Sequence, residues 1–264
     1  MDGVFFEKER DRAAELTPRE SADVVEFVRK RFGIEPDEKQ AEVLRSTAKR
    51  GILNCSRQWG KSTVSAAKAV HRAYTQERSL VLVASPSERQ SAEFLRKAAE
   101  LVGKLGIKPK GDGDNAISLA FPNGSRIVGL PGNGGAVRGF SAVALMLIDE
   151  ASQMDDSMYK TLRPMLAVGQ GDLWLMSTPF GKRGFFYESW VNGGDGWLRV
   201  SVPATECPRI PAAFLEEERQ VLGPMWFGQE YLCEFVDDVT SMFSGDLLDK
   251  ALDDGLVPLG VRGR

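Results

Sequence analysis

The fold of this chain is decided by the stretch Ile52-Leu53-Asn54-Cys55-Ser56-Arg57-Gln58-Trp59-Gly60-Lys61-Ser62-Thr63. The stretch begins like a buried strand, and residues 63–70 after it have the pattern of an amphipathic helix. A strand, a tight turn and a helix N-terminus together form a phosphate-binding loop, in which backbone N–H groups surround the anion. The tripeptide Gly60-Lys61-Ser62 fits such a loop, because its ammonium can reach the β- and γ-phosphate oxygens and its hydroxyl can bind Mg²⁺.

The loop departs from the general pattern at one position. Glycine usually stands first in such loops, and this chain has Cys55 there. The tripeptide Gly60-Lys61-Ser62 is also short enough to arise by chance, so alone it does not establish a nucleotide site. The strand-like residues before the loop and the helical pattern after it favour a nucleotide-binding loop.

Length and composition indicate a globular protein of ordinary type. With 264 residues, of which 42% are hydrophobic, the chain can form one large domain or a core with a small appendage. Its net charge of −3 is unlike that of a domain whose main task is to hold a nucleic-acid backbone, so any contact with DNA would be local. The three cysteines lack metal-ligand spacing, and no apolar run approaches the roughly 20 residues of a membrane span. These features predict a cytosolic protein, and the single histidine, His71, is predicted to have a surface or packing role and no chemical one.

Further apolar runs predict more buried strands at residues 79–84, 143–148 and 172–176. Helical patterns separate these runs, and an Asn-Gly turn predicts a hairpin within residues 116–130. Alternating strands and helices form a three-layer α/β fold with a mostly parallel sheet, in which ligands bind at the carboxyl ends of the strands. One strand–helix unit separates the loop from the acidic strand described next. That order is typical of RecA-type P-loop NTPases with an additional strand, by analogy of fold.

Changes in composition divide the chain into three predicted parts. Residues 1–35 are predicted to be an N-terminal helical segment and residues 36–205 a P-loop ATPase core. Residues 206–264 are predicted to be a small lid or linker subdomain, because two short helical patterns at 212–222 and 224–231 follow the core.

One predicted strand ends in two adjacent carboxylates, Asp149 and Glu150. If the strand lies near the phosphate loop, Asp149 can hold Mg²⁺ beside the hydroxyl of Ser62, and Glu150 can polarise an attacking water. The alternative is that the two acids only cap a helix N-terminus. The phosphate loop upstream favours the metal and catalytic roles.

Small hydroxyl residues, Ser177 and Thr178, followed by Pro179, end the next predicted strand. At the same edge of the sheet they could sense a γ-phosphate, or they could be ordinary turn residues. Gln40 precedes the first core strand, where its amide could read an adenine edge, although an exposed helical glutamine fits the sequence equally well. Arg138 ends a glycine-rich loop, and it is either a functional cation or a solvated arginine of a linker.

Together these motifs resemble the N-terminal ATPase domain of the large terminase subunit, the genome-packaging motor of tailed bacteriophages. The resemblance covers about residues 30–250. It is most specific in the loop, because that family replaces the first glycine and carries an arginine-glutamine pair, here Arg57-Gln58. Residues 147–151 are similar to the family's metal-binding and catalytic-glutamate segment, and residues 177–181 are similar to its coupling motif.

The resemblance implies roles for these residues. It implies Mg²⁺-dependent ATP hydrolysis, with Ser62 and Asp149 at the metal and Glu150 as the catalytic residue. Arg138 is similar in position to an arginine proposed to act in trans on a neighbouring subunit's nucleotide. Arg57 competes for that role or senses the nucleotide in cis, and we favour Arg138 as the trans group. The expected ATP-binding residues are Gln40, Cys55, Ser56, Arg57, Gln58, Trp59, Gly60, Lys61, Ser62 and Thr63.

The resemblance also implies a biological setting. The expected function is packaging of double-stranded DNA into the procapsid in the host cytoplasm. A portal protein and a small terminase subunit are the expected partners. The chain is expected to form a homo-oligomeric ring on the portal and to be a monomer in isolation. No contact with a membrane is expected. Family members usually continue into an RNase H-like nuclease, whereas this chain ends at Arg264. The sequence therefore predicts an ATPase domain without a C-terminal nuclease domain.

Two other functions remain open at this point. A helicase-like nucleic-acid translocase shares the lysine, the Asp-Glu pair and the Ser-Thr pair. A nucleotide-gated scaffold would bind ATP without hydrolysing it. Strand displacement on a forked duplex would indicate the first, and steady phosphate release would exclude the second.

Overall fold

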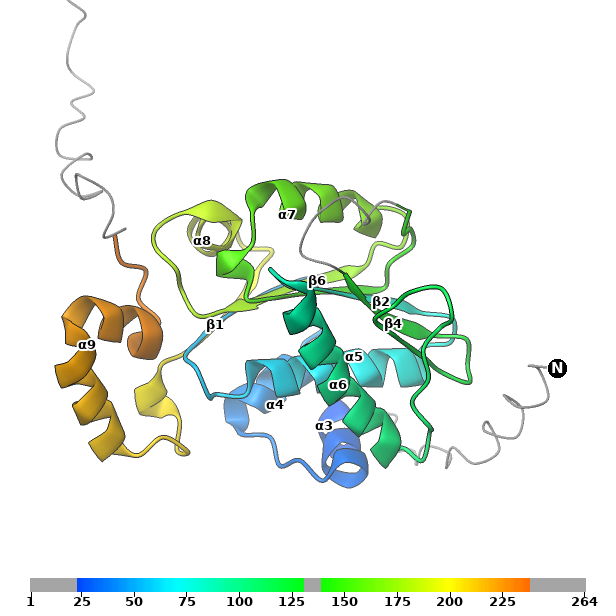
Figure 1. Cartoon of the computed structure of the whole chain (residues 1–264), viewed down its shortest axis with the longest axis horizontal. Coiled ribbons are helices and arrows are strands. Elements are labelled where there is room, and N and C mark those ends of the chain that lie inside the picture. The colour runs from blue at the N-terminus through cyan, green and yellow to red at the C-terminus, as the bar shows by residue number, and fades with distance from the viewer. Residues whose placement is uncertain (1–22, 131–138, 238–264) are drawn as a thin grey trace, which may run out of the picture.

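The computed structural model describes residues 23–130 and 139–237. Its centre is a seven-stranded sheet with the strand order β3-β4-β2-β5-β6-β1-β7 (Figure 1). Every neighbouring pair is parallel except β3 and β4. The predicted mostly parallel sheet is therefore confirmed. The strands are β1 Arg50–Cys55, β2 Leu80–Ala84, β3 Ser118–Ala120, β4 Arg126–Leu130, β5 Leu145–Asp149, β6 Asp172–Ser177 and β7 Leu198–Val202.

Helices cover both faces of this sheet and complete the three layers. In Figure 1, α3 to α6 lie below the sheet, α7 and α8 lie above it, and α9 stands at one end. The bounds are α3 Val24–Phe27, η1 Val28–Phe32, α4 Glu38–Arg45, α5 Lys61–Thr75, α6 Glu88–Lys104, η3 Ala151–Gln153, α7 Asp156–Leu162, η4 Arg163–Leu166, α8 Gly184–Asn192, η5 Ala204–Glu206 and α9 Ala212–Leu232.

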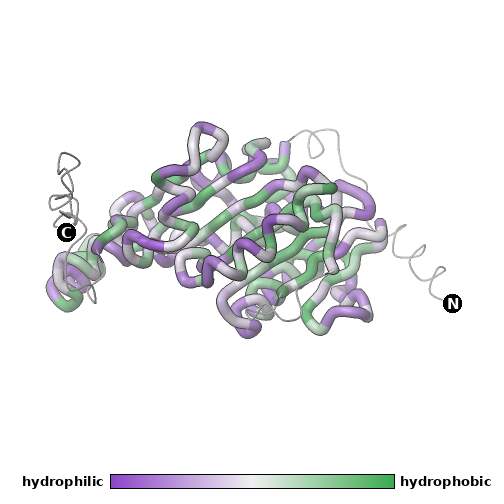
Figure 2. Tube along the Cα trace, turned by 90° about the horizontal axis from the view of Figure 1, so that it is seen from above, coloured by the Kyte–Doolittle hydropathy of each residue, from purple (hydrophilic) through white to green (hydrophobic). Residues whose placement is uncertain are grey.

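The core is two apolar layers, one on each face of the sheet. Successive residues of a strand point to opposite faces of the sheet. Leu53 therefore packs in the layer between the sheet and α4 to α6, and Ile52 packs in the layer between the sheet and α7 and α8. Because both faces are covered, the central strands are apolar throughout, which is why they appear in the sequence as continuous apolar runs. Figure 2 shows these hydrophobic stretches running through the interior, with hydrophilic residues around them.

The strand order positions the candidate site. Strand β6 lies between β1, which leads into the phosphate loop, and β5, which ends in Asp149. In register, Asn54 pairs with Ser177, and Asp149 pairs with Met176. The carboxyl ends of β1, β6 and β5 therefore meet at one edge. β6 follows the acidic strand in the sequence, whereas the strand–helix unit that separates the loop from the acidic strand along the chain is β2 with α6.

Two local predictions are also confirmed. β3 and β4 form the antiparallel hairpin expected around the Asn-Gly turn. The two helical patterns after residue 211 form α9, which is interrupted at Gly223 (φ 72°, ψ 168°) just before Pro224. Within the described ranges, no helix combines the length and the apolar character needed to cross a bilayer.

We predict that Gly51→Ala destabilises the fold. A Cβ on Gly51 would lie 2.5 Å from Cδ2 of the buried Trp174 ring, so the indole must shift within a packed core. Overpacking of this kind costs about 1–3 kcal/mol, which urea unfolding would measure. The matched control is Gly103→Ala on α6, where a Cβ meets nothing within 4 Å. The control should be neutral or stabilised by up to about 1 kcal/mol, and equal effects at the two sites would contradict the prediction.

A second prediction concerns His71, which packs edge-on against Phe27 with the ring centres 5.0 Å apart. Burial, and then the cations Lys68 and Arg72, lower the pKa of His71 from 6.5 to about 4. Between these values the unfolded chain binds a proton that the folded chain does not, so stability falls as the pH falls from about 6.5 to about 4. The resulting loss in the free energy of unfolding amounts to about 2–3 kcal/mol. We expect it to be missing in His71→Phe, measured by urea unfolding at pH 7 and pH 4; parallel losses in both proteins would contradict the assignment.

Candidate active site

The phosphate loop is shaped by two residues with positive φ. Gln58 has φ 66° and Gly60 has φ 100°, and Gly60 is the N-cap of α5. At Gly60 a side chain would be strained by the backbone angle, and its Cβ would lie 3.1 Å from Nε2 of Gln40. The first N–H groups of α5 have no partner within the helix and face the loop. Such a helix N-terminus binds anions.

Lys61 is buried beneath this loop, with 7% of its surface exposed. Its Nζ donates to the carbonyl oxygens of Cys55 (2.7 Å) and Ser56 (3.0 Å) and to Oγ1 of Thr178 (3.3 Å). These three acceptors match the three N–H donors of an ammonium group. Lys61 therefore links the end of β1 to the segment that follows β6.

The acidic residues lie beside the first turn of α5. Oγ of Ser62 donates to Oδ2 of Asp149 at 3.3 Å. Burial, and then the neighbouring charge of Glu150, raise the pKa of Asp149 to about 6, although Lys61 opposes the shift. A hydroxyl and a carboxylate are hard oxygen ligands of the kind that Mg²⁺ prefers, and a cation would offset the cost of burying the Asp149 charge. The donor set therefore fits a magnesium ion.

Glu150 lies in a network of hydroxyl groups at the same edge. Its backbone has φ 50° and ψ 44°, which is uncommon for a residue with a side chain. Its Oε2 lies 3.4 Å from Oγ of Ser177. The Ser177 Oγ lies in turn 2.7 Å from Oγ of Ser152. Ser152 also donates to the carbonyl oxygen of Thr178 at 2.8 Å. The Asp-Glu segment and the Ser-Thr segment thus form one polar cluster.

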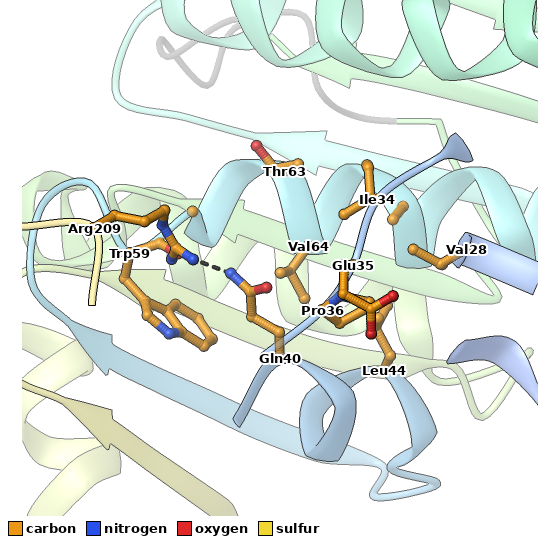
Figure 3. A pocket seen from close by; sticks show the side chains of 12 residues that line it. Val28, Ile34, Glu35, Pro36, Gln40, Leu44, Trp59, Thr63, Val64 and Arg209 are labelled. Carbon is orange, nitrogen blue, oxygen red and sulfur yellow. Dashed lines mark hydrogen bonds between the residues drawn. The ribbon is translucent and has the colours of Figure 1, made fainter. Parts of the chain in front are cut away.

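Two adjoining pockets open on the loop. The polar pocket has a volume of about 310 Å³ and is lined by Arg57, Gln58, Gly60, Lys61, Ser62, Thr63, Lys97 and Glu150. The other pocket, shown in Figure 3, has a volume of about 200 Å³ and a mostly apolar wall that includes Val28, Ile34, Pro36, Leu44 and Val64. Both include Gly60 and Thr63. Together they suit a ligand with a polyanionic part and a flat part with apolar faces.

A model of the family "Terminase large subunit, T4likevirus-type, N-terminal" matches residues 52–250. The chain belongs to this family. The large terminase subunits of Thermus phage G20c and Thermus virus P23-45 are each 26% identical to it, over 88% of this chain and 54% of the relative. The terminase chain thus spans about half the length of these curated relatives.

Solved structures of terminases have the same fold. The ATPase domain of the Thermus phage P74-26 large terminase superposes with a TM-score of 0.70 at 21% identity, over 80% of this chain and 98% of that domain. The large terminase of another thermophilic bacteriophage, in complex with ADP, superposes with a TM-score of 0.63 at 18% identity, over 75% of this chain and 53% of the other. The predicted P-loop NTPase architecture is therefore confirmed.

Gln40 of the terminase chain is not the exposed helical glutamine that the sequence left open, since only 6% of it is exposed. Its Nε2 donates to the carbonyl oxygen of Trp59, a residue beside it in Figure 3, at 2.9 Å. Its Oε1 accepts from the backbone N–H of Asp37 at 3.1 Å. The Asp37 carboxylate in turn accepts from the Gln40 N–H and completes a capping box. Gln40 therefore holds the loop from below while it lines the apolar pocket.

Other predicted residues take places that the sequence could not specify. The side chains of Cys55, Ser56 and Trp59 are buried, so these residues face the loop through their backbone groups. Arg57 Nε donates to Oε2 of Glu230 on α9 at 2.5 Å and also lines the polar pocket. Arg138 lies outside the described residues, and so do residues 1–22 and 238–264 of the two predicted end segments.

The sequence analysis missed two cations at the site. Lys97, on α6, lines the polar pocket together with Lys61 and Glu150. Arg209 Nη2 donates to the carbonyl oxygen of Trp59 at 2.6 Å and approaches Asp37 to 3.6 Å. No local sequence motif marks either residue. Lys97 reaches the site from a face of α6 and Arg209 from the loop before α9, and both segments are distant in sequence from the phosphate loop. The capping box, in contrast, was readable as an aspartate followed three residues later by a glutamine.

The bonds of Gln40 generate a prediction. If Gln40 chiefly supports Trp59 and the loop, Gln40→Ala should weaken binding of ATP and GTP by a similar factor, about tenfold for one lost buried hydrogen bond. If the amide also reads the base, ATP should lose more than GTP. Titration calorimetry with both nucleotides measures this difference. Lys39→Ala, an exposed neighbour on the same helix, is the matched control and should bind both nucleotides normally.

Proposed function

We propose that this chain is the ATP-hydrolysing motor domain of a phage large terminase subunit and that it drives packaging of double-stranded DNA. The observation that carries the proposal is the meeting of Lys61, Ser62 and Glu150 in one pocket at the carboxyl ends of β1 and β5, where Ser62 also bonds Asp149. The solved terminases of similar fold support it, since one is an isolated ATPase domain and others hold ADP or ATP-γ-S.

The residues divide the work of phosphoryl transfer. The first N–H groups of α5 and the ammonium of Lys61 hold the phosphates, with the ammonium exchanging its carbonyl partners for phosphate oxygens. Ser62 and Asp149 would hold Mg²⁺, which neutralises charge on the β- and γ-phosphates. Glu150 lines the same pocket and accepts a proton from the attacking water. The apolar pocket beside Gln40 receives the base.

Charge that develops on the γ-phosphate needs a further cation. We propose Arg138 for this role in trans, since Arg57 is bonded to Glu230 of α9 and is better placed to link the nucleotide to the lid. An arginine finger typically contributes about 10³–10⁵ in rate. Ser177, Thr178 and Pro179 are proposed to couple the state of the nucleotide to the rest of the motor.

Family membership supports a proposal for the wider setting. We propose that residues 36–205 act as the ATPase core, residues 1–35 as a helical segment and residues 206–264 as a lid, and that the motor assembles as a ring on a portal protein in the host cytoplasm. A small terminase subunit would deliver the double-stranded DNA. These partners are proposals for the packaging complex, of which this chain is one part.

The test of the proposal is Glu150→Gln. We expect ATP binding close to that of the unchanged chain and a fall in kcat of about 10²–10⁴, because the amide cannot accept the proton from water. Phosphate release at high protein concentration measures the rate, and calorimetry measures binding. Glu100→Gln, an exposed acid on α6, is the control and should keep its activity. Turnover that survives Glu150→Gln would remove the residue from its role.

A further inference from the structure

The hydroxyl network beside Glu150 contains fewer protons than acceptors. Ser152 has one hydroxyl proton, and it donates that proton to the carbonyl oxygen of Thr178, which can only accept. The 2.7 Å contact between the two serines is much shorter than the 3.4 Å contact from Ser177 to Glu150, so we assign the Ser177 proton to the contact with Ser152. The single proton of Ser177 is thereby used, and the 3.4 Å contact from Ser177 Oγ to Glu150 Oε2 has no proton of its own.

From this count we infer that Ser152 is a positioning residue that keeps Ser177 from holding Glu150. While Ser152 is bonded to Thr178, it takes the Ser177 proton and leaves the Glu150 carboxylate available to water. If Ser152 loses the Thr178 carbonyl, its own proton can turn to Ser177, and Ser177 can donate to Glu150. A carboxylate that accepts such a hydrogen bond is stabilised in its charged form and fixed toward Ser177, so it accepts a proton from water less readily. This inference rests on the proposed role of Glu150 as the group that activates water.

The backbone around Ser152 fixes its hydroxyl. Glu150 is in the left-handed conformation, and the N–H of Gln153 donates to the Glu150 carbonyl at 3.0 Å. The N–H of Met154 donates to the carbonyl of Ala151, whose side chain is 1% exposed. This tight turn, η3, places Ser152 between the segment after β5 and the segment after β6. A strained backbone next to a reacting group is consistent with such a positioning role.

Thr178 connects this network to the phosphate loop. Its carbonyl oxygen accepts from Ser152, and its side-chain oxygen accepts from the ammonium of Lys61. Lys61 is also the group proposed to hold the phosphates. Thr178 is thus bonded both to the lysine of the phosphate loop and to the hydroxyl network beside Glu150.

The test compares four variants of the full chain: Ser152→Ala, Ser152→Thr, Ser177→Ala and the double variant Ser152→Ala/Ser177→Ala. In Ser152→Ala, the Ser177 proton passes to Glu150, so kcat should fall about 10–100-fold while KM for ATP changes little. Ser152→Thr keeps the hydroxyl and should retain kcat within about threefold, a loss of about 0.7 kcal/mol at most. Steady-state phosphate release at one high protein concentration gives both constants.

The decisive result is the double variant. Without Ser177, nothing in this network can donate to Glu150, so Ser152→Ala/Ser177→Ala should turn over faster than Ser152→Ala by about fivefold or more. A merely structural role of Ser152 predicts instead that the two losses add, and additive losses would overturn the inference. So would an unchanged kcat in Ser152→Ala. If Glu150→Gln retains turnover, the proposed function itself is wrong. If Glu150→Gln loses turnover while the losses in kcat of the serine variants add, only the role of Ser152 is wrong.

Discussion

The site depends on one constraint, the burial of the Lys61 ammonium. An unpaired buried charge is costly, so a lysine with 7% exposure must have its donors satisfied. Two of its acceptors are carbonyl oxygens at the end of β1, and the third is Thr178, just beyond β6. That arrangement requires β6 to lie directly beside β1, as it does. The strand order and the chemistry of the loop are thus two aspects of the same requirement.

The same edge of the sheet also holds α9. Asn54 Nδ2 donates to the carbonyl of Cys233 at 2.9 Å, and Gln229 Oε1 accepts from the N–H of Gly181 at 3.1 Å. The pair of Arg57 and Glu230 adds a third tie. The apolar cluster beneath α9 is small, with Leu215 and Phe227 among its few buried members. Polar contacts at this edge of the sheet therefore contribute much of what holds this helix, and the pair of Arg57 and Glu230 ties it directly to the phosphate loop.

Much of the fold and part of the site could be predicted from the sequence, for a physical reason. Strands buried on both faces leave continuous apolar runs, and a loop built from backbone groups needs glycine and lysine at fixed spacing, so β5, Gly60 and Lys61 were readable. Lys97 and Ser152 were not, because their places depend on the packing of α6 and on the turn after Glu150. Gln40 was ambiguous because its exposure depends on how α4 docks under the loop.

Cys55, the departure from the general loop pattern, has a packing explanation. It is the last residue of β1, it is fully buried, and its Sγ donates to the carbonyl of Val200 on the neighbouring β7 at 3.8 Å. The residues with left-handed backbones in this loop are Gln58 and Gly60, so glycine is not required at position 55. In the proposed site, a phosphate would meet the loop's backbone and Lys61, and neither is affected by a side chain pointing into the core. A side chain at the start of the loop therefore adds core packing and leaves the phosphate site intact.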